Sequence, residues 1–166
     1  MVKKQIDEMN RQIMHWLSEE GMYKDKTTDD KAHFHFVGEY PQGTGKVFEV
    51  VQPKNRDDQI LVGNALGISP EHQTKLRELS SDEKSSFLWS IKHGLLFRDS
   101  GFNILPDGNN PQQIQFITEL YYDGLNKNRL METIRENHRC NLFVIWKFME
   151  RFGESSGPEP TSPMFG

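Results

Sequence analysis

The stretch that decides the fold is residues 33–66, which read HFHFVGEYPQGTGKVFEVVQPKNRDDQILVGNAL. Apolar and polar residues alternate at its start, as they do in a half-buried strand. Two polar, turn-rich segments, 41–45 and 53–58, interrupt it. Short strands joined by compact turns are typical of an antiparallel meander. The stretch therefore predicts three consecutive strands, at 33–40, 47–52 and 59–66.

Helical patterns flank this meander on both sides. Apolar residues recur every three or four positions in residues 2–20 and again in 126–152. Between them, Ser69-Pro70 and then Ser80 with Glu83 are typical helix starts, which predict two helices that end near Leu79 and Leu96. Two further strands are predicted, at 102–105 and 113–121. Residues 23–32 are polar and are predicted to be a loop.

The predicted fold class follows from this order of elements, α-β-β-β-α-β-β-α. Groups of hairpin-linked strands separated by helices indicate an α+β two-layer sandwich, with one antiparallel sheet of about five strands and helices packed on one face. We expect a single domain over residues 1–152. Residues 153–166 have no periodicity and are rich in Pro, Gly and Ser, which predicts a flexible C-terminal tail.

Composition limits the classes of function. The 166 residues carry a net charge of −4 and no long basic cluster, which argues against a nucleic-acid partner. No apolar run approaches the roughly 20 residues that span a bilayer, and no secretory signal follows Met1, so we expect no membrane partner. The single cysteine, Cys140, excludes an intramolecular disulfide and fits a reducing, cytoplasmic location.

Gly43-Thr44-Gly45-Lys46 superficially resembles a phosphate-binding loop. That motif requires a glycine where Tyr40 stands and a Ser or Thr where Val47 stands, and it opens a helix rather than a strand. A hairpin turn is the better interpretation.

His33 and His35 have a spacing that can hold a metal, but a site needs a third ligand. The pair His138 and Cys140 does not share a helical face and offers neither a ligand set nor a clear nucleophile. There is also no Gly-x-Ser-x-Gly elbow. We therefore predict no catalytic residue, no cofactor and no metal; in a pocket, the first residues to test would be His33, His35 and Glu39.

Two predicted helices carry more apolar residues than one buried stripe needs. In the helix that ends at Leu96, Trp89 and Leu96 are seven residues apart and share a face opposite the expected core. In the last helix, Phe143 and Trp146 lie off the stripe predicted as core, which is Leu130, Met131, Ile134, Leu142, Ile145, Met149 and Phe152. Such aromatic residues are typical of partner or self-association surfaces. Alternatively, Met164 and Phe165 of the tail cover these helices.

The chain also resembles known families. Its element order is similar to the fold of type III secretion chaperones, small acidic proteins that are usually homodimers and hold an extended partner segment. More specifically, the chain resembles an archaeal and bacterial domain-of-unknown-function family of the same general architecture over about residues 1–152. The runs that carry this second resemblance are Tyr40-Pro41, Val50-Val51-Gln52-Pro53-Lys54, Asp58-Gln59-Ile60-Leu61-Val62 and Ile68-Ser69-Pro70-Glu71-His72.

Two functions remain open from the sequence. The first is a non-catalytic, chaperone- or adaptor-like protein-binding domain, acting as a homodimer, whose partner adds a strand to a sheet edge or covers an apolar helix surface. The second is a small-molecule-binding or enzymatic domain with a pocket between sheet and helices.

Overall fold

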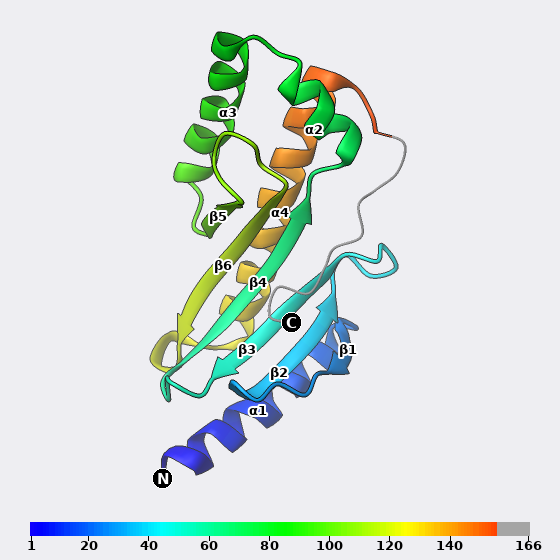
Figure 1. The fold of residues 1–166 in the computed structure, drawn as a ribbon. Coiled ribbons are helices and arrows are strands. Elements are labelled where there is room, and N and C mark those ends of the chain that lie inside the picture. Colours follow the sequence, from blue (N-terminus) through cyan, green and yellow to red (C-terminus); the bar gives the residue numbers. More distant parts are fainter. Residues whose placement is uncertain (156–166) are drawn as a thin grey trace.

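The computed structural model describes residues 1–155 as four α-helices, six strands and one short 3-10 turn (Figure 1). Helices and strands alternate along the chain in nearly the predicted order. The helices are α1 (Val2–Glu19), α2 (Pro70–Arg77), α3 (Ser81–Leu96) and α4 (Lys127–Phe152). The strands are β1 (Tyr23–Lys26), β2 (Ala32–Glu39), β3 (Val47–Pro53), β4 (Gln59–Gly67), β5 (Gly101–Leu105) and β6 (Gln113–Tyr121), and the 3-10 turn is Tyr122–Gly124.

The strands form one antiparallel sheet in the order β1-β2-β3-β4-β6-β5. Strands β2, β3 and β4 make the predicted meander, and β6 pairs with β4 along its whole length, from Gln59 opposite Tyr121 to Gly67 opposite Gln113. Helix α4 runs behind the sheet, with α1 at one end and α2 and α3 at the other (Figure 1). The predicted α+β fold class, with one antiparallel sheet and helices on one face, is confirmed.

Strand β1 is the difference from the prediction, which had a polar loop over residues 23–32 and about five strands. Three of its four side chains are exposed, so no apolar residues are needed there. Its sequence, Tyr-Lys-Asp-Lys, therefore shows no apolar alternation that could predict a strand. What holds it in the sheet is backbone pairing with β2, such as Lys26 opposite Phe36. An edge strand of this kind is set by its neighbour rather than by its own residues.

The helix-facing side of the sheet carries two apolar clusters. The first lies between α1, the β2–β3–β4 meander and the start of α4, and includes Ile13, Phe36 and Ile134. The second lies between α2, α3, β6 and the end of α4, and includes Leu95, Phe116 and Phe148.

A polar layer separates the two clusters. On β4 it contains Asn64, between Val62 of the first cluster and Leu66 of the second. On β6 it contains Thr118, which lies opposite Val62 and between Phe116 of the second cluster and Leu120 of the first, and on α4 it contains Asn137. Thr118 Oγ1 donates a hydrogen bond to Asn137 Oδ1 at 3.2 Å, and Asn137 Nδ2 donates to the Val62 carbonyl at 3.1 Å. These bonds satisfy the buried amide of Asn137 and tie α4 to the centre of the sheet.

The second half of α4 is rotated from the predicted core stripe. The buried side chains there are Cys140, Val144 and Phe148, whereas the predicted Ile145 and Met149 are only partly buried. The prediction is wrong in phase because the buried face continues through two polar residues, Asn137 and Asn141. A search for apolar periodicity passes over such residues.

The prediction of a C-terminal tail falls mostly outside the described residues, as do Met164 and Phe165. Helix α4 ends at Phe152, and Gly153 follows it with a φ of +81°, a backbone conformation that favours glycine. The domain boundary at residue 152 therefore stays a prediction.

Candidate functional site

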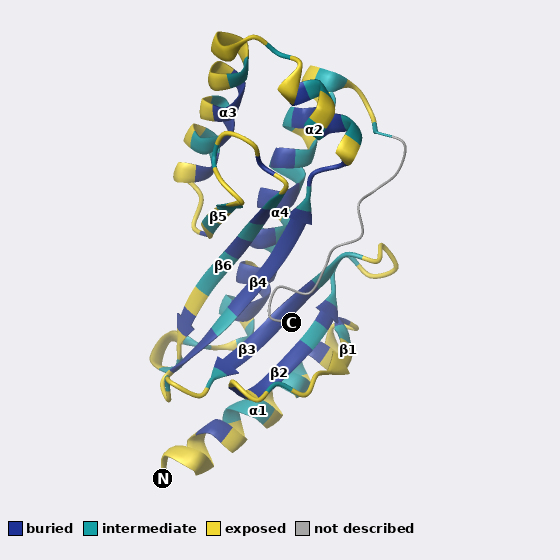
Figure 2. Cartoon of the chain, viewed as in Figure 1, coloured by how far each residue is buried: buried dark blue, intermediate teal, exposed yellow. Residues whose placement is uncertain are grey.

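Helix α3 carries exposed apolar side chains on its outer face and at its C-terminal end, which we call the α3 surface: Trp89, Leu96 and Phe97. Their exposed fractions are 52%, 65% and 84%. The helix begins with a capping box. The Glu83 backbone N–H donates to the Ser80 hydroxyl, and the Ser80 backbone N–H donates to the Glu83 carboxylate. Its inner face packs in the second cluster, and its outer face is exposed to solvent (Figure 2).

The α3 surface is apolar and basic rather than purely apolar. Lys92 Nζ lies 4.6 Å from the centroid of the Trp89 ring, and the His93 ring lies 5.4 Å from the same centroid. Residues 84–98 contain no Asp or Glu at all. Large aromatic side chains with a cation over one face are characteristic of binding surfaces.

Trp146 belongs to a separate surface on α4, with an exposed fraction of 62%. Phe143, one turn before it, is half-buried and packs against Gly94 of α3, so the Gly94 side of α3 faces α4. Helical geometry of about 100° per residue puts Trp89 and Leu96 on roughly the opposite side of α3 from Gly94. The structure thus exposes three of the four predicted surface residues, on two different helices, and places Phe143 between these helices.

The two edges of the sheet differ in chemistry. Edge strand β1 carries Lys24, Asp25 and Lys26, and charges of this kind protect an edge from pairing with other chains. Edge strand β5 reads Gly-Phe-Asn-Ile-Leu and carries no charge. It begins four residues after Phe97, so an uncharged edge adjoins the α3 surface along the chain.

His35 is the most buried of the predicted pocket residues, with 1% of its surface exposed. Its Nδ1 lies 3.1 Å from Asp29 Oδ2 and its Nε2 lies 2.8 Å from Glu49 Oε1. The hydrogen bond to Glu49, together with the charges of both carboxylates, raises the pKa of His35 against the opposing effect of burial. The group is an ion-paired cluster on the β2–β3 part of the sheet.

The other two predicted pocket residues lie apart from this cluster. His33 is exposed. The Glu39 carboxylate accepts hydrogen bonds from the backbone N–H groups of Gly43 at 2.7 Å and Gly45 at 3.0 Å. Glu39 therefore fixes the glycine-rich hairpin turn, whose glycines have φ angles of +80° and +75°. The structure does not bring His33, His35 and Glu39 together around a pocket.

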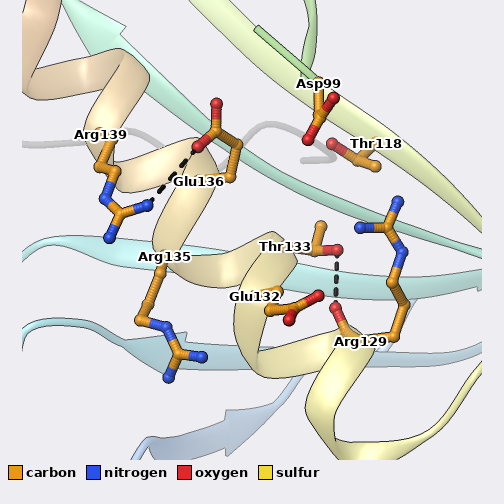
Figure 3. Close-up of a pocket in the computed structure, with 8 residues that line it drawn as sticks. All are labelled: Asp99, Thr118, Arg129, Glu132, Thr133, Arg135, Glu136 and Arg139. Carbon is orange, nitrogen blue, oxygen red and sulfur yellow. Dashed lines mark hydrogen bonds and ion pairs between the residues drawn. The ribbon is translucent and has the colours of Figure 1, made fainter.

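A cavity of about 340 Å³ lies elsewhere, between α4, β6 and the segment that follows α3 (Figure 3). Its lining is entirely polar or charged and consists of Asp99, Thr118, Arg129, Glu132, Thr133, Arg135, Glu136 and Arg139. The volume lies at the small end of the roughly 300–1,000 Å³ typical of ligand pockets. A pocket between sheet and helix was expected for the second function, but from different residues.

Some charges of this cavity are already paired. Arg98 holds Glu136 with two bonds, Nε to Oε1 at 2.7 Å and Nη2 to Oε2 at 2.8 Å, and Asn128 donates to Glu132 at 2.9 Å. In the part of the chain that the structure describes, the side chains of Arg129 and Asp99 make no hydrogen bond or ion pair. These two opposite charges are therefore available to a ligand.

Other candidate chemistry is weak in the described residues. Burial raises the pKa of the Cys140 thiol to about 11, which makes it a packing residue rather than a nucleophile. Among residues 1–155, no three His, Cys, Asp or Glu side chains are arranged to hold a metal ion. No helix there combines the length and the apolar character needed to cross a membrane.

Sequence reasoning missed Phe97, the β5 edge and the cavity. Phe97 directly follows Leu95-Leu96, so the run of three apolar residues at a helix end was an available signal. The cavity had no such signal, because Asp99, Thr118 and Arg129 come from three separate segments.

Comparison with known proteins gives a family and a fold. A family described as "Uncharacterized conserved protein (DUF2299)" matches residues 9–148. Among solved structures, an uncharacterized protein from Methanothermobacter thermautotrophicus is 33% identical, with a TM-score of 0.79, over 92% of this chain and 100% of that one. YbjN from E. coli, described as a putative transcription regulator, is 15% identical, with a TM-score of 0.49, over 84% of this chain and 89% of that one. No match was found among the curated proteins.

Proposed function

The chain belongs to the DUF2299 family of uncharacterized conserved proteins, and we propose that it is a non-catalytic protein-binding domain, chaperone- or adaptor-like, that acts as a homodimer. The resemblance in element order to type III secretion chaperones supports the same kind of function, the holding of an extended segment. The proposal includes a cytoplasmic location, which the single reduced Cys140 fits.

The observation that carries the proposal is the α3 surface. Removing exposed aromatic and aliphatic side chains from water is favourable by about 25 cal/mol per Å² of apolar area that is buried. Trp89 and Leu96 share one face of a helix that begins with a capping box, and Phe97 follows at its end, so the three make an apolar platform rather than scattered exposed residues. A partner with apolar side chains would bury this area.

The mechanism we propose is strand addition at β5. An extended partner segment would pair its backbone with the uncharged edge of β5, while its side chains contact Leu96 and Phe97 at the end of α3. The charged strand β1 at the other edge disfavours the same reaction there. Backbone pairing gives affinity that depends little on sequence, which suits a chaperone.

The test of partner binding is suppression of aggregation. The full chain is mixed with reduced, unfolding insulin, and light scattering of the insulin is followed over time. We expect the wild type to suppress aggregation and Trp89→Glu to suppress it several-fold less, because the substitution places a carboxylate in the apolar platform. Val2→Glu, at an exposed apolar position of α1 away from both proposed contact surfaces, is the matched control and should suppress as well as the wild type. A wild type without effect, or an unaffected Trp89→Glu variant, would contradict the proposal.

For the homodimer, we propose contact through the Trp146 face of α4. Trp146 is 62% exposed and lies on α4, a different helix from the one that carries the α3 surface, so that the dimer would leave the α3 surface open. Multi-angle light scattering should give twice the chain mass for the wild type and for Trp89→Glu, and the mass of one chain for Trp146→Glu. A monomeric wild type would rule out the homodimer.

A further inference from the structure

We propose that the cavity between α4 and β6 binds a small zwitterionic molecule, with a carboxylate at Arg129 and an ammonium group at Asp99. This site is independent of the protein-binding surface, since its residues lie on other elements and none belongs to the α3 surface. The ligand class follows from the position of the cavity, from its unpaired charges and from its hydrogen-bonding capacity.

The cavity opens onto the polar layer that separates the two apolar clusters. Thr118 lines it from the strand side and Thr133 from the helix side, and both hydroxyls are held by the fold. Thr118 Oγ1 donates to Asn137 at 3.2 Å, and Thr133 Oγ1 donates to the Arg129 carbonyl at 2.8 Å. The cavity wall is therefore a fixed polar surface rather than a gap between mobile surface side chains.

The charges of the cavity are separated in space. Figure 3 shows the Arg129 guanidinium extending from the first turn of α4 toward Thr118, while the carboxylate of Asp99 enters from the strand side. Glu136 lies on the helix near Asp99 but is held by two bonds from Arg98. The cavity thus presents a free cation and a free anion, which no ion pair between them satisfies.

The hydroxyls specify the rest of the ligand. Because each threonine proton is already donated, Thr118 and Thr133 can offer only acceptor lone pairs to a bound molecule. Asp99 is an acceptor as well. Arg129 supplies donors in the planar arrangement that matches a carboxylate. The complement of Arg129 and Asp99 is a carboxylate joined to a cationic N–H donor, as in an amino acid, and an inorganic anion would leave Asp99 unpaired.

The experiment titrates the full chain with glycine, β-alanine, 4-aminobutyrate and 6-aminohexanoate, and follows amide chemical shifts. Butyrate and butylamine are the matched probes that carry only one charge. We expect at least one amino acid to bind about tenfold more tightly than either single-charge probe, with shifts at residues 99, 118 and 129. Failure of every amino acid to bind at millimolar concentration would overturn the proposal, and so would equal binding of butyrate.

Substitutions then locate the site. Arg129→Gln and Asp99→Asn should each weaken binding about tenfold, because each leaves one ligand charge unpaired. Lys147→Gln is the control on the same helix, since Lys147 does not line the cavity, and should leave affinity unchanged. Thermal melting of each variant shows that it is folded. Binding that survives both Arg129→Gln and Asp99→Asn would place the ligand elsewhere and contradict the assignment. Because Trp89→Glu leaves this cavity intact, either proposal can fail alone.

Discussion

His35 is a buried histidine held between two carboxylates, and its replacement tests what that cluster contributes. In His35→Gln, Glu49 loses its cationic partner at a position where only a few per cent of its side chain is exposed. Breaking a buried ion pair from one side is strongly destabilising, and we expect a loss of about 2–3 kcal/mol in the free energy of unfolding, measured with urea. His33→Gln, two residues away and exposed, is the control and should change stability little.

We also expect the stability difference between the wild type and His35→Gln to depend on pH. The pKa of His35 is raised in the folded state by its hydrogen bond to Glu49 and by the nearby carboxylates. A raised histidine pKa contributes stability that is fully present below the unfolded pKa and is lost as pH rises through the folded pKa. The stability difference between wild type and His35→Gln should therefore be largest near about pH 5.5 and shrink toward about pH 8.5. A difference that grows with pH would show that the cluster is not held by a protonated His35.

At the scale of single residues, the sequence predicts exposure better than partners. The exposure of Trp89, Leu96 and Trp146 follows from helical spacing alone, which is a local property. The partners of His35 do not, because Asp29 comes from the segment before β2 and Glu49 from β3. Only the fold of β2 and β3 brings the Asp29 and Glu49 carboxylates to the imidazole ring of His35.

Among the elements, the contact between α3 and α4 depends on Gly94. A Cβ at this position would overlap with the ring of Phe143. Gly94→Ala should therefore destabilise the protein by about 1–3 kcal/mol, although alanine is the better helix former by about 1 kcal/mol. Thermal or urea unfolding of the purified variant measures the change.

The control uses the same substitution without the ring. In a Phe143→Ala background the overlap is gone, so Gly94→Ala should stabilise the protein through its helix propensity. A change of sign between the two backgrounds supports the packing explanation. If Gly94→Ala is stabilising in the wild type, the α3–α4 contact is looser than described.

The elements themselves were largely predictable, since caps and periodicity are local signals. The capping residues Ser69 and Ser80 mark the starts of α2 and α3 in the sequence and in the structure. Strand β1 and the phase of late α4 were not predictable in this way. The first depends on pairing with β2, and the second on buried asparagines that resemble surface residues.

Across the whole molecule, the sheet carries two apolar clusters with a polar layer between them. Asn64, Thr118 and Asn137 form this layer, and the mixed-charge cavity opens onto it. The α3 surface and edge β5 lie on the side of the second cluster, beyond the layer. The molecule thus combines an apolar surface for a polypeptide with a separate polar cavity, and neither could be located before the topology was known.

In the proposed complex, a partner segment adds its backbone to the edge of β5 beside the α3 surface. Hydrogen exchange of the full chain, alone and saturated with a permanently unfolded, reduced and alkylated model protein, tests it most directly. We predict slower amide exchange in residues 96–105 of the complex, with no change in β1 at residues 23–26. Unchanged exchange at residues 101–105 in a chain that has bound the unfolded protein would rule out strand addition at β5.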